Sequence, residues 1–246
     1  MFDYSIPVLE RIKLPILWER LPCGVRIEDL HEKSYDDVEQ HIREHYIVED
    51  PMLKACDLSK DPDSVDHYIE LVHHWMRDTQ SFIAIEEGSA KVVGVLIGRA
   101  IDKNTHLKTM SRISIYEGET LQKIQRFRMH LSKEVDVFDI YNIPAYFRIY
   151  IWSVEPNFQG KGIGEALLRT SIKQTKLFKM KALMGIFTGA VSQNIVSKFG
   201  FQAHLEVMYS QWVEDNEVVF GDPGPGNYSA KVMVLKIDIP EDTTKD

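Results

Sequence analysis

The sequence predicts a mixed α/β (α+β) protein, with a central mixed sheet of about seven strands and helices on both faces. Stretches rich in β-branched residues alternate with stretches whose apolar residues recur every three or four positions, the periods of strands and helices. Of the 246 residues, 44% are hydrophobic, which is enough for one sizeable core. We find no internal repeat and expect a single domain over residues 1–246.

Two helices are expected in the first third of the chain, after a segment punctuated by prolines. Within residues 34–46, apolar side chains recur at a spacing of four and form one helical face. Ser34 is a candidate N-cap, because its hydroxyl can accept hydrogen bonds from the free N–H groups of a first turn. The helix is expected to break at Glu-Asp-Pro, residues 49–51, and a second helix is expected at about 64–77.

The period then changes to that of strands. Residues 81–87 and 91–101 are rich in β-branched side chains and flank a Glu-Gly-Ser-Ala turn, which predicts a β-hairpin. The next segment, 102–144, is polar and mixed in charge. Because residues 117–130 are mostly compatible with a helix, we expect this segment to be a helical insertion.

The C-terminal half is expected to alternate strands with helices. Gly200 is expected to end the last helix, because glycine tolerates the left-handed backbone conformation. Residues 239–246 are expected to form a disordered tail. The expected strands are 147–154, 183–188, 201–212 and 229–237, and the expected helices are 163–177 and 192–199.

Charge and cysteine content narrow the range of functions. The formal net charge of −8 gives no general attraction to phosphate backbones, so we expect no nucleic-acid partner, whereas a small cation would be steered favourably. The two cysteines, Cys23 and Cys56, fit a reducing compartment. The first residues lack the apolar core of a secretory signal, and no uncharged apolar run has membrane length. We therefore expect a cytoplasmic protein without a membrane partner, and a monomer by default.

A cluster of glycines stands between an expected strand and an expected helix. Gly160, Gly162 and Gly164 fall within five positions. This arrangement can hold phosphate, because glycines allow close backbone approach and a helix start offers free N–H donors. A dinucleotide fingerprint would need glycine in place of Glu165, and a Walker A loop would need Ser or Thr after Lys161. Both motifs are therefore excluded.

The remaining pattern resembles the acetyl-CoA pyrophosphate loop of the GNAT N-acetyltransferase superfamily, Q/R-x-x-G-x-G/A. Residues 159–164 read Gln-Gly-Lys-Gly-Ile-Gly and follow Val-Glu-Pro at 154–156. The resemblance continues with Ala-Leu-Leu at 166–168 and with Gly-Phe at 200–201, after a short helix. It implies the GNAT fold, acetyl-CoA as co-substrate and no metal.

In that superfamily, the strand before the loop splays from its neighbour, and its free backbone N–H groups bind the acetyl and pantetheine portions. The loop that follows holds the pyrophosphate. The positions that the resemblance assigns to acetyl-CoA are Trp152, Ser153, Val154, Gln159, Gly160, Lys161, Gly162, Ile163 and Gly164.

The whole chain also looks like the insect-type arylalkylamine N-acetyltransferases, the dopamine N-acetyltransferase family. Those enzymes carry an acidic D-E-P-L segment, whereas this chain reads Glu49-Asp50-Pro51-Met52, with the two acids exchanged. The catalytic glutamate of the family falls on Asp50 by alignment and on Glu49 by residue type. Alkyl amines hold their proton up to a pKa of about 10, so acetyl transfer needs a base such as one of these carboxylates.

The departing CoA thiolate can also take a proton. Many superfamily members supply it from a tyrosine four residues before the Gly-Phe pair, where this chain has Val196. The insect family instead places two hydroxyl residues four positions apart, which match Thr188 and Ser192. Ser192 is equally compatible with a helix N-cap. Tyr209, expected in the following strand, is the alternative acid.

Residues 41–45 read His-Ile-Arg-Glu-His and match the H-x-x-E-H zinc motif. Two imidazoles one helical turn apart could share a metal, but a further ligand would have to come from elsewhere. The apolar face of this short helix includes His45, and we expect no metal here.

The sequence therefore predicts an acetyl-CoA-dependent N-acetyltransferase that transfers acetyl directly to a small primary amine. An arylalkylamine of the dopamine, tyramine or serotonin type is the expected acceptor. No cysteine lies near the motifs, which disfavours a covalent acetyl-enzyme. The alternatives are a polyamine or protein-amine acetyltransferase, and a catalytically inactive acyl-CoA-binding module.

Overall fold

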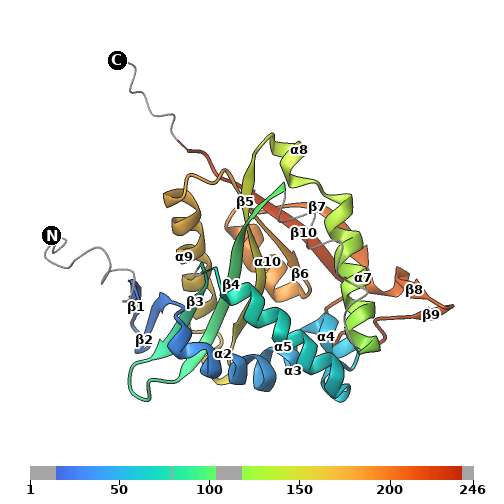
Figure 1. Cartoon of the computed structure of the whole chain (residues 1–246), viewed down its shortest axis with the longest axis horizontal. Helices are drawn as coiled ribbons and strands as arrows, with labels where there is room; N and C mark the ends of the chain where they lie inside the picture. The colour runs from blue at the N-terminus through green and yellow to red at the C-terminus, as the bar shows by residue number, and fades with distance from the viewer. Residues whose placement is uncertain (1–14, 79, 104–117, 240–246) are drawn as a thin grey trace, which may run out of the picture.

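The computed structural model of the protein describes residues 15–78, 80–103 and 118–239. In these residues, eight strands form one sheet in the order β1-β2-β3-β4-β5-β6-β10-β7 (Figure 1). Strands β5 and β6 pair in parallel, and the other neighbours pair antiparallel. The strands are β1 (Leu17–Leu21), β2 (Val25–Asp29), β3 (Phe82–Glu86), β4 (Val92–Asp102), β5 (Ala145–Val154), β6 (Ala182–Phe187), β7 (Gln202–Met208) and β10 (Ser229–Lys236), with β8 (Val213–Glu214) and β9 (Glu217–Val218) as a separate ribbon.

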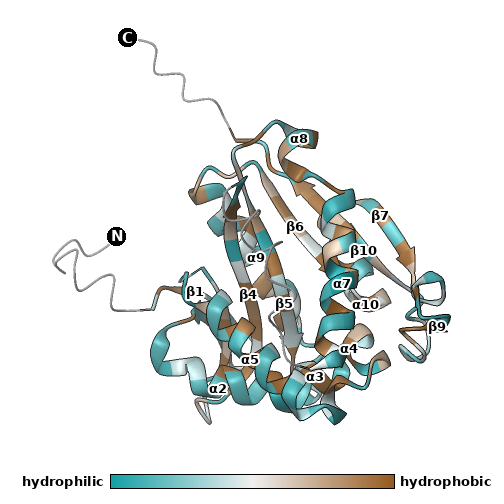
Figure 2. Cartoon of the chain, turned by 45° about the vertical axis from the view of Figure 1, so that its right-hand side comes forward, coloured by the Kyte–Doolittle hydropathy of each residue, from teal (hydrophilic) through white to brown (hydrophobic). Residues whose placement is uncertain are grey.

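Helices cover both faces of the sheet and build a hydrophobic core on each, which confirms the predicted fold class. Figure 2 shows hydrophobic residues along β4 and β5, in the middle of the sheet, and hydrophilic residues on the outer sides of the helices. None of the helices in the described parts of the chain has the length and apolar character needed to cross a membrane. One face carries α2 (Tyr35–His41), α3 (Ile47–Glu49), α4 (Pro51–Ala55), α5 (Pro62–Met76), α7 (Glu119–Glu134) and α8 (Val137–Tyr141), and the other carries α9 (Ile163–Leu177) and α10 (Ala190–Lys198).

The hairpin of β1 and β2 was not predicted. Its strands are only five residues long and β1 is half exposed, so the alternation of apolar and polar residues is weak. Gly24, with φ of +76°, makes the turn, and the Trp18 indole donates to Asp29 Oδ1 at 2.6 Å. The Pro22–Gly24 turn between short apolar stretches is the signal that could have indicated this hairpin.

Several predicted elements differ in detail from those observed. The α2 helix begins after Ser34, but the Ser34 hydroxyl makes no capping hydrogen bond, so that part of the prediction is wrong. A π-helical turn, η2 (Ile42–Tyr46), continues α2 into α3. Helices α7 and α8 lie within the predicted helical insertion, of which residues 104–117 are outside the described residues. The predicted disordered tail also lies outside them from residue 240 onward.

Strands β5 and β6 diverge in the middle of the sheet. Strand β5 pairs with β4 as far as Val154, but its pairing with β6 ends at Ile149. The register against β4 shifts at Tyr150, which indicates a β-bulge at the point of divergence. The edge of β5 that faces β6 is therefore open beyond Ile149, as the resemblance led us to expect.

Candidate functional site

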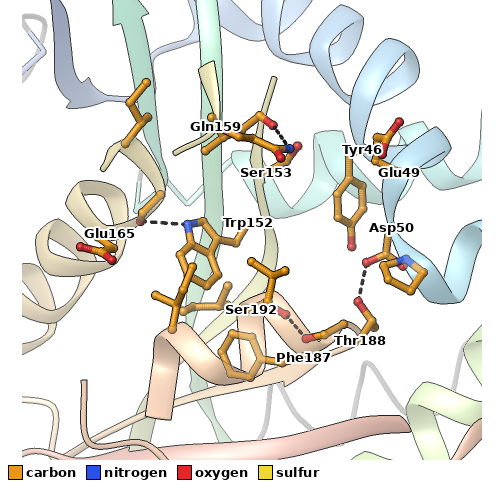
Figure 3. A pocket seen from close by; sticks show the side chains of 18 of the residues that line it. Tyr46, Glu49, Asp50, Trp152, Ser153, Gln159, Glu165, Phe187, Thr188 and Ser192 are labelled. Carbon is orange, nitrogen blue, oxygen red and sulfur yellow. Dashed lines mark hydrogen bonds between the residues drawn. The ribbon is translucent and has the colours of Figure 1, made fainter. Parts of the chain in front are cut away.

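A cavity of about 560 Å³ lies where β5 and β6 diverge (Figure 3). Its walls come from η2 and the start of α4, the end of β5, the glycine loop with the first turn of α9, and the end of β6 with the start of α10. Among the described residues that line it, none is a lysine or an arginine, and three are carboxylic acids: Glu49, Asp50 and Glu165. The lining therefore favours a cation over an anion at the end that holds Glu49 and Asp50.

The glycine loop forms one end of this cavity. Gly160 and Gly162 have φ of +73° and +79°, a left-handed conformation that side chains other than glycine adopt at a cost. A Cβ placed on either glycine would have no other atom within 4 Å, so the space in front of the loop is open. Gly162 is the N-cap of α9, whose first turn leaves free N–H groups. The loop therefore has the open backbone surface and helix start that phosphate groups require.

Two side-chain hydrogen bonds hold the loop against β5. The Trp152 indole Nε1 donates to the Gly164 carbonyl at 3.1 Å, and the Gln159 amide donates to the Val154 carbonyl at 3.1 Å. All four residues line the cavity, together with Ser153 and Ile163. Lys161 is not among the lining residues, and its ammonium lies over the Phe158 ring, 4.5 Å from the centroid. The structure thus brings the predicted acetyl-CoA residues together around the cavity, except for Lys161, which is not part of its lining.

Ser153 contacts a histidine at the end of α2 that does not itself line the cavity. Its Oγ lies 3.1 Å from His41 Nε2. Burial, followed by the nearby His45, lowers the pKa of His41 to about 4, so the imidazole is neutral near pH 7. Residue His41 comes from the H-x-x-E-H sequence, and its visible role is to orient a residue of the cavity wall.

The second histidine of that motif faces Glu155 instead. His45 Nε2 lies 3.8 Å from Glu155 Oε2, and the same carboxylate pairs with Lys91 at 2.9 Å. In the parts of the chain that the structure describes, no three His, Cys, Asp or Glu side chains are grouped so that they could hold a metal ion.

Asp50 forms the opposite end of the cavity from the glycine loop. This carboxylate, 8% exposed, caps α4: its Oδ1 accepts from the N–H groups of Met52 and Leu53, both at 3.1 Å. Its Oδ2 accepts from Thr188 Oγ1 at 2.6 Å (Figure 3). Burial raises the pKa of Asp50, and the Thr188 hydrogen bond is the largest influence that opposes it. Asp50 is therefore more basic than an ordinary aspartate and held in one orientation.

Glu49 differs from Asp50 although the two are neighbours. It ends α3 and is exposed, yet it lines the same cavity. The backbone turns extended at Asp50 (φ −62°, ψ 124°), as the predicted break requires, and this turn directs one acid into the protein and leaves the other at the surface.

The two predicted hydroxyl residues both line the cavity, but they bond differently. Thr188 is buried and donates to Asp50, whereas Ser192 Oγ donates to the Gly189 carbonyl at 2.8 Å. Gly189, not Ser192, is the N-cap of α10, so the N-cap interpretation of Ser192 is wrong. The helix begins two residues earlier than predicted.

Tyr209 also differs from its prediction. It begins a 3-10 turn, η6 (Tyr209–Gln211), because β7 ends at Met208. Its hydroxyl donates to the Thr188 carbonyl at 2.6 Å, and the ring is 2% exposed. Burial raises the pKa of Tyr209 well above the ordinary value, and the residue does not line the cavity. Tyr209 therefore lies outside the cavity lining and holds the backbone of Thr188 through its hydroxyl group.

Several residues of the cavity were not predicted as site residues. Tyr46 lies one helical turn before Asp50, so its spacing was a usable signal for a shared face. For the other unpredicted residues, no local sequence pattern distinguishes a side chain that lines a cavity from one that packs in the core, because apolar and aromatic residues are favoured at both kinds of position. The unpredicted apolar and aromatic lining residues include Tyr46, Phe158, Phe187, Val191 and Ile195.

No family model matches this sequence, and none of the curated proteins searched is similar to it. Solved structures are similar. Arylalkylamine N-acetyltransferase 2 from Aedes aegypti is 25% identical, covers 87% of this chain and 100% of its own, and has a TM-score of 0.81. Putative arylalkylamine N-acetyltransferase 7 from the same mosquito is 24% identical over 96% of this chain and 98% of its own, with a TM-score of 0.78. The polyamine N-acetyltransferase of Drosophila melanogaster is 16% identical over 87% and 100%, with a TM-score of 0.76.

Proposed function

Because this chain has the GNAT fold and resembles insect arylalkylamine N-acetyltransferases, we propose that it transfers an acetyl group from acetyl-CoA to a small primary amine, an arylalkylamine. The observation that carries the proposal is the cavity itself. A phosphate-type glycine loop closes one end, and a buried carboxylate with its hydroxyl partner closes the other. The open edge of β5 lies between them.

The chain fits acetyl-CoA by its backbone. Gly160 and Gly162 leave the space that a pyrophosphate needs, and the first turn of α9 offers N–H donors to it. The open edge of β5 beyond Ile149 offers backbone groups to the pantetheine and to the thioester oxygen, where negative charge develops. When bound, acetyl-CoA supplies the activated acyl group.

Asp50 is the proposed general base. Its buried carboxylate attracts the ammonium group and takes one proton, and the raised pKa makes it a better acceptor than a solvent-exposed aspartate. The neutral nitrogen then bonds to the thioester carbon, and the carbon–sulfur bond breaks. As the amide forms, the nitrogen releases its second proton, and this proton restores the hydroxyl that protonates the departing thiolate. Thr188 orients Asp50, and the Ser192 hydroxyl, which lines the same cavity, is the proposed donor to the thiolate.

Aromatic and apolar side chains support an aryl group on the acceptor. Tyr46, Tyr150 and Phe187 line the cavity, and aromatic faces attract cations as well as packing against other rings. One observation favours a second candidate, a polyamine: the exposed carboxylate of Glu49 could pair with a distant second ammonium. A dication would therefore use both acids, whereas an arylalkylamine would need only Asp50.

Thiol release from acetyl-CoA by the purified full chain tests the proposal. The acceptors are tyramine, dopamine and serotonin, compared with spermidine, agmatine and a lysine peptide. The proposal predicts the highest kcat/KM with the aromatic amines. Turnover confined to spermidine or agmatine would replace the acceptor and keep the transfer, and binding of acetyl-CoA without turnover of any amine would indicate an inactive binding module.

A further inference from the structure

Helix α10, which carries Ser192, has no capping side chain of its own. Its N-cap is Gly189, which offers no side-chain acceptor to the free N–H groups of the first turn. The acceptor comes from the segment between β9 and β10, because Asn227 Oδ1 accepts from the Ala190 N–H at 3.0 Å. Asn227 lies 37 positions further along the chain, and it makes from outside the helix the contact that an N-cap side chain normally makes.

The Asn227 carboxamide is held at both ends. Besides the bond from Ala190, its Nδ2 donates to the Pro223 carbonyl at 3.2 Å. The segment itself is anchored to η6, since the Tyr209 N–H donates to the Tyr228 carbonyl at 2.9 Å. Asn227 lines the cavity, but both ends of its amide are engaged by the protein. The side chain is therefore suited to holding α10 rather than to binding a substrate.

The start of α10 packs closely against its neighbours at the acceptor end of the cavity. A Cβ placed on Gly189 would lie 3.0 Å from Pro51 Cγ and 3.1 Å from Asn227 Oδ1, so a larger residue would displace one of them. Pro51 directly follows Asp50, the proposed base. Asn227 and Pro51 thus meet at Gly189, and all three residues line the cavity.

One peptide group joins Asn227 to Ser192. The peptide between Gly189 and Ala190 donates its N–H to Asn227 Oδ1, and its C=O accepts from the Ser192 hydroxyl at 2.8 Å (Figure 3). Because a peptide group is planar and rigid, a hydrogen bond to its N–H also fixes the direction of its C=O. Hydrogen bonds linked in this way polarise one another. The direction of the Ser192 hydroxyl therefore depends on Asn227.

We propose that Asn227 is a positioning residue for the proton donor: by binding the N–H of the Gly189–Ala190 peptide, it fixes the carbonyl that orients the Ser192 hydroxyl. This inference rests on the proposed function, in which Ser192 protonates the departing thiolate. It also gives the segment between β9 and β10 a role in the site, since Asn227 is the residue of that segment that lines the cavity.

The test compares Asn227 variants with loss of the cap of another helix. Asn227→Ala and the similarly shaped Asn227→Leu both remove the acceptor of the Ala190 N–H, whereas Asn227→Asp keeps an acceptor oxygen. The matched control is Asp136→Ala. Asp136 Oδ1 caps α8 by accepting from the N–H groups of Phe138 and Asp139 at 2.9 and 3.2 Å, and Asp136 does not line the cavity.

The expected results separate capping from positioning. Loss of a cap should lower Tm by about 2–4 °C in Asn227→Ala, in Asn227→Leu and in the control. Misplacement of a catalytic group is costly, so kcat should fall about 10-fold to 100-fold in the two Asn227 variants and stay unchanged in the control. Asn227→Asp should keep a kcat near that of the wild type. CoA affinity should be the same in all variants, because the glycine loop lies at the other end of the cavity.

A double variant shows whether Asn227 acts through Ser192. If it does, Asn227→Ala should lower kcat by less than about twofold once Ser192 is already alanine, whereas independent effects would multiply. Multiplying effects, a kcat in Asn227→Ala and Asn227→Leu equal to that of the control, or an equal loss in Asn227→Asp would overturn the inference.

Failure of the inference and failure of the proposed function give different results. Normal turnover in Ser192→Ala would overturn the inference but leave the acetyl transfer in place. If no amine is turned over, the proposed function fails, and hydrogen exchange of the Ala190 amide tests the contact with Asn227 by itself. This amide should exchange faster in Asn227→Ala than in the wild type and in Asp136→Ala, and equal exchange would overturn the inference.

Discussion

Replacing Gly162 by alanine should separate the cost of backbone strain from the loss of acetyl-CoA binding. Gly162 and Gly24 have nearly the same φ, +79° and +76°, and a Cβ on either would meet no atom within 4 Å. A left-handed alanine costs about 1–2 kcal/mol. The reduced freedom of the unfolded chain returns about 0.4–1 kcal/mol. Both variants should therefore lose about 1 kcal/mol of stability, and their Tm should fall by about 2–4 °C.

Only the Gly162 variant should lose acetyl-CoA affinity. Its new methyl group would occupy the space in front of the loop and keep a pyrophosphate from the N–H groups of α9. Hydrogen bonds to charged groups contribute about 1.5–3 kcal/mol each, so losing one weakens binding about 10-fold to 100-fold. Thermal unfolding measures the first effect and calorimetric titration with CoA the second. Equal CoA affinity in Gly162→Ala and Gly24→Ala would refute the assignment of the loop.

Two further predictions concern buried polar groups. Thr188→Val leaves Asp50 Oδ2 without its hydrogen-bond donor, so the free energy of unfolding should fall by about 1–3 kcal/mol. Because this hydrogen bond lowers the pKa of Asp50, its loss should move the acidic limb of kcat/KM to higher pH. Thr188→Ser keeps the donor and should resemble the wild type in urea unfolding and in the pH profile. The pKa of His41 is lowered from 6.5 to about 4 in the folded protein. As the pH falls, the unfolded chain therefore binds a proton at His41 at a higher pH than the folded chain does, so the free energy of unfolding should fall between pH 6.5 and pH 4. Between pH 7 and pH 5, urea unfolding of the wild type should lose about 2 kcal/mol more than that of His41→Asn, and equal losses would show that His41 is not held neutral.

The parts of the site that could be predicted are those that depend on neighbours in the sequence. The glycine loop and α9 were recognisable because backbone conformation and helix start are encoded within a few residues of Gly162. The predicted helix bounds of α9 match the observed ones for the same reason. The hairpin of β1 and β2 was not predicted, because its short strands are stabilised by pairing with β3 and by a Trp18–Asp29 hydrogen bond. Neither interaction produces a recognisable pattern in the local sequence.

The sequence leaves the choice between Glu49 and Asp50 open, because the proposal of Asp50 as the base rests on its burial, which is a tertiary feature. The side-chain donor to Asp50 is Thr188, which lies 138 positions away in the sequence. Ser192 was ambiguous for a similar reason. Whether a hydroxyl caps a helix depends on where the helix begins, and α10 begins two residues before the predicted start.

The proton acceptor is the central claim of this account, and kcat/KM of Asp50→Asn and Glu49→Gln with acetyl-CoA and the best acceptor amine tests it most directly. Asp50 is buried and hydrogen-bonded at the cavity wall, whereas Glu49 is exposed. General-base catalysis contributes about 10²-fold to 10⁴-fold. The account predicts a loss of that size in Asp50→Asn and a loss below about tenfold in Glu49→Gln. A large loss in Glu49→Gln with near-normal turnover in Asp50→Asn would contradict it.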